Sequence, residues 1–410
     1  MNVAVVGGGL AGLAAALDLV DAGHGVTVYE ARPTLGGAVQ TLPEREGDPE
    51  PPPDNGQHIA LGCFTEYLGF LERIGESGSF LRTRLALPVL DKEGNVAAIE
   101  SSLRALLSYR HLSLRERFRL PVTTLRLRSA HSHPQETFGQ LLRRLGETDT
   151  SINCFWDVFI RPALNLRCDE ADADAGLFTV RTALLGPRAN GDLVLPTRPL
   201  GQMHGDAAGA ALTAAGAAVR SETRVDSLDE LDADAIVVAV PPRESARLLG
   251  EAEPALEDSP IVSVHLWFEH RLLEPPLAAL LDSDAHWVFD RGALTGNPPE
   301  RGQYLTVASS GVPELLEVRG RELVQRIAGQ LTERLGEAEL LWSRVSREPY
   351  ATIALRPGVQ RPGVETSLPH VARAGTWTDT GWPATMESAI RSGRRAAQHI
   401  LSSTSARVTA

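Results

Sequence analysis

The sequence predicts an α/β protein in which a domain built on a parallel sheet is interrupted by a second, α+β domain. Three observations indicate this fold. Residues 2–6 form an apolar strand that runs directly into a glycine turn and a helical pattern over residues 10–22. A second apolar run, residues 26–29, ends at the acid Glu30. Strand patterns return after a long intervening segment, at residues 235–240, so the first domain is assembled from separated parts of the chain.

The glycine turn predicts a bound dinucleotide. The candidate binding residues of this segment are Gly7, Gly9, Leu10, Ala11, Gly12 and Glu30. Gly7 permits the tight turn, Gly9 lets the backbone approach the phosphates, and Gly12 lets the helix pack on the strand. Backbone N–H groups at the helix start then face a pyrophosphate, and Glu30 accepts hydrogen bonds from ribose hydroxyls.

The composition excludes several other classes of protein. With 410 residues, 43% of them hydrophobic, the chain has material for two or three domains with substantial cores. A formal charge of −12 argues against general nucleic-acid binding. The cysteines Cys63, Cys154 and Cys168 are too few and too scattered for a disulfide framework or a zinc site. We therefore expect no metal and a cytoplasmic location, and we find neither a signal peptide nor a membrane span.

The chain has a single lysine, Lys92. The chain therefore has no GxxxxGK[ST] phosphate loop. A lysine that forms a Schiff base would have to be Lys92, which lies in a predicted exposed hairpin turn.

The remaining elements set the predicted domain boundaries. Helical spacing begins at residues 63–74, and a mainly helical stretch is expected to continue to about residue 145. Later elements are expected as a helix at 207–215, strands at 261–268, 287–289 and 304–308, a helix at 313–335, and a final strand, glycine loop and helix from about residue 384. The boundaries predicted from these patterns are 1–62, 196–250 and 340–402 for the first domain, 63–195 and 251–339 for the second, and 403–410 for a frayed tail.

Two sequence blocks resemble a known family. They are Asp54-Asn55-Gly56-Gln57-His58 and the block from Trp377 to Ala389, Trp-Thr-Asp-Thr-Gly-Trp-Pro-Ala-Thr-Met-Glu-Ser-Ala. With the glycine turn they resemble the flavin-containing amine oxidase and phytoene desaturase superfamily, and within it the squalene-associated desaturases, the hydroxysqualene dehydroxylases of hopanoid synthesis. This resemblance implies a Rossmann-like FAD-binding domain of the GR2 type, interrupted by an α+β substrate-binding domain with a mixed sheet and a helical portion.

The resemblance also implies which further residues contact FAD. They are Ala31, Arg32, Gly36, Gly37, Val225, Gly375, Thr376, Ala384 and Thr385. The helix that starts near Ala384 is expected to stabilise negative charge on a reduced flavin. Two positions depart from the family: Ala38 stands where arginine is usual, and Thr376 stands where aspartate is usual. Arg32 is a candidate to replace the missing charge.

The loop Asp54–His58 is the candidate for catalysis. One interpretation is an ordinary hydrogen-bonded turn, because Asp-Asn-Gly favours turns. The resemblance instead implies contact with flavin or substrate, with Asp54 or His58 as the proton donor. The candidate substrate-binding residues are Asn55, Gln57, Trp267 and Trp382.

The function that the resemblance implies is reductive removal of the hydroxyl group of hydroxysqualene by an FAD-dependent oxidoreductase. Two alternatives stay open: a carotenoid-type desaturase or other isoprenoid-oxidising or amine-oxidising flavoenzyme, and a non-catalytic carrier of prenyl lipids. Expected partners are an isoprenoid substrate and other enzymes of the squalene and hopanoid pathway.

A basic segment also predicts a partner surface. Between Arg104 and Arg128 there are seven arginines and one glutamate, interleaved with leucines and Phe118. Such a segment suits peripheral contact with an anionic membrane surface. The alternative is an ordinary solvated helix face.

Overall fold

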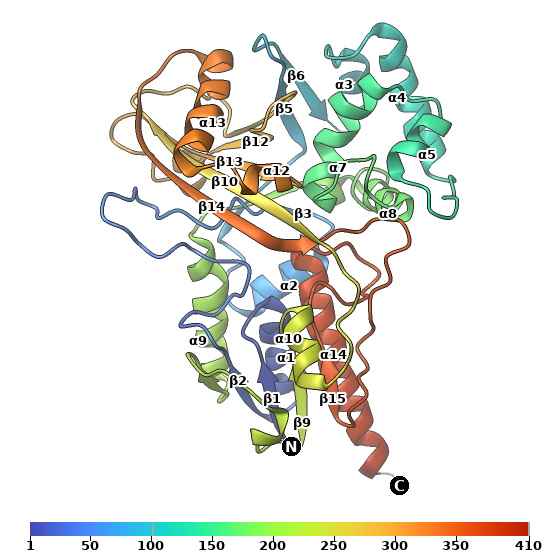
Figure 1. Ribbon diagram of the computed structural model, residues 1–410, viewed down its shortest axis with the longest axis vertical. Helices are drawn as coiled ribbons and strands as arrows, with labels where there is room; N and C mark the ends of the chain where they lie inside the picture. Colours follow the sequence, from blue (N-terminus) through green and yellow to red (C-terminus); the bar gives the residue numbers. More distant parts are fainter. Residues whose placement is uncertain (101, 409–410) are drawn as a thin grey trace.

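The computed structural model describes residues 1–100 and 102–408. Two sheets of different type divide the molecule into a lower and an upper part (Figure 1). The lower part has a five-stranded sheet with the order β15-β9-β1-β2-β8, in which every pair is parallel. Its strands are β1 (Asn2–Val6), β2 (Gly25–Tyr29), β8 (Ala218–Arg220), β9 (Ala235–Val238) and β15 (Val371–Arg373).

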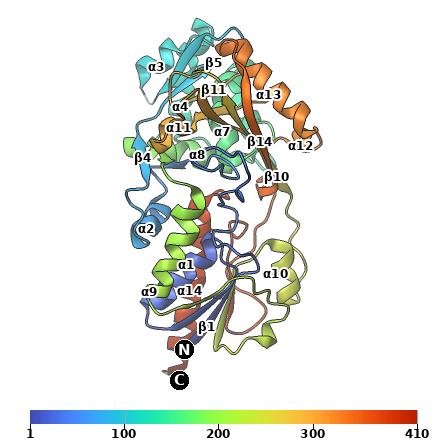
Figure 2. The same ribbon diagram turned by 90° about the vertical axis from the view of Figure 1, so that its left-hand side faces the viewer.

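Helices cover both faces of this parallel sheet. The helices α1 (Leu10–Asp21), α9 (Ala207–Ala214) and α14 (Met386–Val408) lie on one side, and α10 (Pro242–Leu249) lies on the other (Figure 2). The central strand β1 is apolar and buried from Val3 to Val6, because helices cover both faces of the sheet there. This part is therefore a Rossmann-like domain, as predicted, and it is assembled from the two ends and the middle of the chain.

The upper part is built on a mixed seven-stranded sheet with the order β14-β10-β13-β12-β11-β5-β6, in which β11 and β5 are the parallel pair. Its strands are β5 (Ala86–Leu90), β6 (Val96–Glu100), β10 (Asp258–Phe268), β11 (Leu277–Leu280), β12 (Trp287–Asp290), β13 (Gln303–Ser310) and β14 (Leu340–Ile353). A small antiparallel sheet joins β3 (Ala60–Leu61), β7 (Leu193–Pro196) and β4 (Phe80–Thr83).

Helices cover both faces of the mixed sheet as well. One face packs on α12 (Pro313–Leu316) and α13 (Gly320–Leu335). The other face shares a core with a helical group: α3 (Leu103–Ser108), α4 (Leu114–Leu127), α5 (Phe138–Arg144), α6 (Asp149–Ser151), η1 (Ile152–Trp156), α7 (Asp157–Leu164) and α8 (Ala173–Ala183). The remaining elements are α2 (Thr65–Arg73), α11 (Arg291–Thr295), and the short helices η2 (Arg188–Gly191), η3 (Gln202–Asp206) and η4 (Leu228–Glu230).

The structure corrects two of the predicted domain boundaries. β14 pairs with β10, so residues 340–353 belong to the upper sheet and not to the first domain. α2 contributes Tyr67, Phe70 and Leu71 to the core that α1 and α14 share, so the first domain continues past residue 62. Membership was mispredicted at both places because it depends on a distant packing partner and not on local pattern.

Three predicted elements also differ. Residues 80–100 form β4, β5 and β6, although the sequence indicated helix there. The single helix expected at 313–335 is divided into α12 and α13. The expected tail from 403 is helical as far as Val408, and residues 409–410 lie outside the described part of the chain. Across residues 1–100 and 102–408, no helix combines the length and apolar character that crossing a bilayer requires.

Candidate functional site

The glycine turn that joins β1 to α1 consists of backbone atoms without side chains. The Gly7 N–H donates to the carbonyl of Tyr29 at 2.8 Å, which ties the turn to the end of β2. A Cβ at Gly12 would lie 1.9 Å from the carbonyl oxygen of Gly7, so a larger residue does not fit there. No side chain caps the start of α1. The positive end of this helix is therefore free of a side-chain acceptor, as binding of a pyrophosphate requires.

A second glycine pair packs directly on the first. Gly36 donates its N–H to the carbonyl of Gly8 at 2.8 Å. A Cβ at Gly37, which has a φ of +63°, would lie 2.7 Å from the Cα of Gly9. The two glycine segments thus contact each other backbone to backbone, and together they leave a cradle without side chains that suits a dinucleotide.

Glu30 closes β2 and holds the turn from the other side. Its carboxylate accepts from the Gly8 N–H at 2.7 Å and from the Arg32 N–H at 2.8 Å. The Arg32 guanidinium donates to the carbonyl of Gly37 at 3.3 Å, so a positive charge lies beside the glycine pair although Ala38 has none. Ala31 and Ala38 are exposed beside them.

Two further segments reach the same edge of the sheet. Thr223 donates its N–H to the carbonyl of Glu30, which brings the buried Val225 to the end of β2. The N–H of Ala374 donates to the carbonyl of Val238, which brings Gly375 and Thr376 to the end of β9. Ala384 and Thr385 directly precede α14, which begins at Met386, two residues later than expected. All these predicted residues lie at the carboxyl ends of parallel strands, where this class of sheet binds its ligands.

Asp54 is fully engaged by protein groups. One carboxylate oxygen accepts from the Thr41 hydroxyl at 2.7 Å and from the Leu200 N–H at 2.9 Å. The other accepts from Arg291, which α11 supplies from the upper part of the molecule. Burial raises the pKa of Asp54, and the Arg291 guanidinium opposes that rise. With both oxygens occupied, Asp54 positions the loop, and its geometry does not favour proton donation to a substrate.

Of the next residues, some anchor the loop and others are buried polar groups without a hydrogen-bond partner in the part of the chain that the structure describes. The amide of Asn55 donates to the carbonyl of Ala38 at 2.8 Å, so the loop is fixed to the segment after the glycine pair. Gly56 lies against β10, where an added Cβ would be 3.0 Å from the hydroxyl of Ser263. Neither amide atom of Gln57, nor the Ser263 hydroxyl, has a hydrogen-bond partner within the described residues. Gln57 is therefore free to bind a ligand.

His58 lies beside a second buried histidine. The Nδ1 of His204 contacts the carbonyl of Leu200 at 2.8 Å and its Nε2 contacts the Tyr67 hydroxyl at 2.7 Å. Because a carbonyl only accepts, we assign the proton of neutral His204 to Nδ1, and Tyr67 donates to Nε2. Burial lowers the pKa of His204 to about 4, and burial together with proximity to His204 lowers the pKa of His58 to about 4. His58 nevertheless keeps part of its surface accessible.

The two tryptophans predicted to bind substrate lie far apart in the fold. Trp382 lies in the loop before α14, with Phe64 and Phe178 edge-on at 5.9 and 5.0 Å between ring centroids and the Arg391 guanidinium 4.7 Å from its ring centroid. Trp267 lies near the carboxyl end of β10, four residues after Ser263, and its indole N–H donates to the carbonyl of Arg301. Its strand partners, Tyr304 and Trp342, also belong to the upper sheet.

Several residues of the site carried no signal in the sequence. They are Arg291, Ser263, His265, His204 and Tyr67. His265, fully buried on β10, contacts the Thr306 hydroxyl at 3.1 Å, and burial beside Arg291 lowers its pKa to about 3. None of them lies in a recognisable motif, so only the packing of segments that are distant along the chain reveals them.

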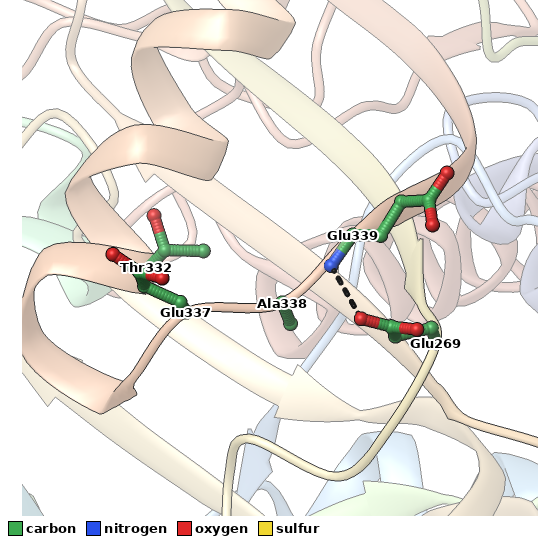
Figure 3. Close-up of a pocket in the computed structure, with 5 residues that line it drawn as sticks. All are labelled: Glu269, Thr332, Glu337, Ala338 and Glu339. Carbon is green, nitrogen blue, oxygen red and sulfur yellow. Dashed lines mark hydrogen bonds between the residues drawn. The ribbon is translucent and has the colours of Figure 1, made fainter.

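One hollow on the surface lies away from these residues. It has a volume of about 520 Å³, lies at the outer end of the upper sheet and is lined by Glu269, Thr332, Glu337, Ala338 and Glu339 (Figure 3). It contains none of the candidate residues. Within the described part of the chain, no group of three His, Cys, Asp or Glu side chains is placed to hold a metal ion.

The fold and the double-glycine cradle define a flavoprotein of the oxidoreductase type, and the comparisons agree. The chain belongs to the family of flavin-containing amine oxidoreductases, whose model matches residues 10–401. Its cofactor is therefore a flavin. Among solved structures, cyclohexylamine oxidase from Brevibacterium oxydans superimposes with a TM-score of 0.71 at 18% identity, over 98% of this chain and 99% of that one.

Curated relatives match over nearly their whole length. The hydroxysqualene dehydroxylases of Rhodopseudomonas palustris and Sinorhizobium fredii are 29% and 28% identical, over 98% of this chain in each case and 98% and 99% of theirs. The zeta-carotene desaturase of Arabidopsis thaliana is 23% identical over 98% of this chain and 85% of that protein. The chain is thus similar to isoprenoid-modifying members of the family along its full length.

Proposed function

We propose that the protein is an FAD-dependent oxidoreductase that reduces hydroxysqualene to squalene. The observation that carries this proposal is the loop Asp54–His58, which is anchored beside the glycine pair and presents the free amide of Gln57. The full-length similarity to two hydroxysqualene dehydroxylases supports the substrate. Similarity to a desaturase is compatible with it, because desaturation moves a hydride in the opposite direction.

We further propose that the flavin is FAD. A smaller flavin would occupy only one end of the site. The candidate residues, however, lie at both ends of it. The glycine cradle and Glu30 suit a pyrophosphate and a ribose. The segment of Ala384 and Thr385, at the start of α14, suits the flavin ring, where a helix N-terminus stabilises negative charge. FAD is the flavin nucleotide that has groups for both ends.

The reaction replaces a C–OH bond by a C–H bond and releases the oxygen as water, so it consumes one hydride and one proton. Reduced FAD, when bound, supplies the hydride. Asp54 and Asn55 hold the loop in place through their hydrogen bonds to Leu200, Arg291 and Ala38. Gln57 donates to the substrate hydroxyl and orients it. His58 delivers the proton.

The chain offers no lysine for amine oxidation. Lys92 lies between β5 and β6 with 63% of its side chain exposed, paired with Asp282 at 3.7 Å. This hairpin is on the opposite edge of the upper sheet from β10 and Gly56. An amine-oxidase mechanism that requires a lysine beside the flavin is therefore disfavoured.

The decisive experiment is anaerobic incubation of chemically reduced holoprotein with hydroxysqualene, followed by assay for squalene and for reoxidation of the flavin. The proposal expects one squalene per flavin reoxidised. Oxidised holoprotein that instead introduces double bonds into a carotenoid precursor would favour the desaturase. Protein that binds squalene tightly but takes up no flavin would favour the prenyl-lipid carrier.

A further inference from the structure

Helix α4 exposes a row of large apolar side chains to solvent. Its members are Leu114, Phe118, Val122 and Leu125, with 68, 67, 48 and 64% of their surface exposed. Since an α-helix turns by about 100° per residue, these four lie within about a quarter of its circumference. We call this row the α4 stripe. Of the ten large apolar residues exposed in the described part of the chain, four belong to it.

Arginines border the α4 stripe on both sides. By the same helical geometry, Arg115 and Arg126 lie along one border, and Arg117 and Arg128 lie along the other. Between residues 104 and 128 the chain has seven arginines and one glutamate, a net charge of +6 in a protein of net charge −12. No carboxylate in residues 1–100 or 102–408 makes an ion pair with any of the seven.

The single acid of this segment is turned inward. Glu116 accepts from the Ser113 N–H at 2.9 Å in a capping box and also accepts from the Thr148 hydroxyl. On the opposite side of α4, Leu120 and Leu127 are fully buried in the core of the helical group. One apolar face of α4 therefore anchors the helix in the core. A second apolar face, the α4 stripe, is exposed to solvent, and folding alone does not require it.

We propose that α4 is a docking surface for an anionic lipid bilayer. An exposed apolar row bordered by long cationic side chains is the arrangement of a helix that lies in a membrane interface, with its apolar side chains among the acyl chains and its arginines at the phosphates. A protein partner of matching charge would need an apolar groove inside an acidic rim. An anionic bilayer, in contrast, offers apolar acyl chains beneath negatively charged phosphates at every point of its surface. α4 also lies at the end of the molecule remote from both termini (Figure 1).

The test is sedimentation of flavin-loaded protein with vesicles of phosphatidylglycerol and phosphatidylcholine, and with phosphatidylcholine vesicles as reference. We expect wild type to bind the anionic vesicles at low salt and to be released by high salt. The variant F118S/L125S is expected to lose at least about tenfold in partitioning, because two large apolar side chains no longer enter the lipid. R115Q/R128Q is expected to lose about tenfold on anionic vesicles and little on neutral ones.

A matched control uses apolar residues that are equally exposed but lie outside the α4 stripe. L341S/Y350S alters two such residues on β14, with 46 and 78% of their surface exposed, and is expected to bind vesicles as wild type does. Thermal unfolding of each variant checks that it folds. Equal binding by F118S/L125S and wild type, or no binding by wild type, would overturn the proposal. So would a wild-type dimer that F118S/L125S converts to monomer while vesicles bind neither, because the stripe would then join two copies of the chain.

Discussion

Arg291 donates a hydrogen bond to Asp54 across the boundary between the two sheets, and each of these charged residues is only 2% exposed. The Arg291 Nε has no further partner within the described residues. The pair joins the upper domain to the loop that holds Gln57 and His58. The same two side chains thus hold both the upper domain and the loop Asp54–His58 in position.

We expect Arg291→Met and Asp54→Asn each to lower the free energy of unfolding, by about 3 kcal/mol for the arginine, because each leaves a buried polar group unpaired. The double variant should lose less than the sum of the single losses. Denaturant unfolding of all four proteins gives the coupling. Strict additivity would show that the two side chains do not act as a pair.

Gly12→Ala is expected to abolish flavin binding, because its methyl group would be placed 1.9 Å from the Gly7 carbonyl oxygen. The flavin absorbance of purified protein after reconstitution measures the effect. Gly329→Ala is the matched control, since it also replaces a helical glycine and its added methyl group meets nothing within 4 Å. A Gly12→Ala protein that retained a full complement of flavin would contradict the backbone cradle.

Arg32→Ala is expected to weaken FAD binding by about tenfold, because the guanidinium at Gly37 is the cation beside the glycine pair. Adding Ala38→Arg to that variant should restore binding by supplying a charge at the position where the family usually carries it. Titration of apoprotein with FAD gives the dissociation constants. If Arg32→Ala bound FAD as tightly as wild type, Arg32 would not replace the charge missing at Ala38.

His58→Gln is expected to slow single turnover of reduced enzyme by about 10²-fold or more and to leave bound flavin unchanged. Because the pKa of His58 is lowered to about 4, its protonated fraction rises about tenfold for each pH unit from pH 7 down to about pH 5. The wild-type rate should therefore increase towards acid, and the variant should lack that increase. Identical pH profiles for the two proteins would remove His58 from proton transfer.

The stability of the protein is expected to fall between about pH 6.5 and pH 4. His204 has an ordinary pKa of 6.5 when unfolded and a pKa of about 4 when folded, so in that window the unfolded state binds the additional proton. Its contribution is complete above pH 6.5 and is lost as the pH falls. His204→Gln should make the pH dependence shallower, by up to about 1.4 kcal/mol per pH unit. An unchanged slope would contradict the neutral histidine inferred from its contacts with Leu200 and Tyr67.

The sequence was sufficient to predict the parts of the site that consist of backbone. Gly7, Gly12 and Gly37 are required by steric contacts at fixed positions, so their spacing predicts the cradle directly. The strands of the second sheet were harder to assign to a domain. β14 begins with Leu-Leu-Trp and continues with a mixture of polar and apolar residues, a pattern that fits either domain, and only its pairing with β10 assigns it to the upper one.

The polar partners inside the core could not be predicted. Arg291 is 237 residues from Asp54 along the chain, and nothing in its local sequence distinguishes it from the other arginines. The short strands β4, β5 and β6 were mistaken for helix because strands of four or five residues give little periodicity. Long-range pairing, which local pattern does not encode, decides each of these cases.

The parallel sheet has a consequence for biosynthesis. β1 is synthesised long before β15 and α14, which complete its sheet and cover α1. At about 5 to 20 residues per second, synthesis of residues 1–410 takes roughly 20 to 80 s. During that time the nascent segment that carries β1 lacks the strand and the helix that complete its domain. The flavin site can therefore form only after residues 371–408 have left the ribosome, and a chain interrupted before residue 371 would lack it.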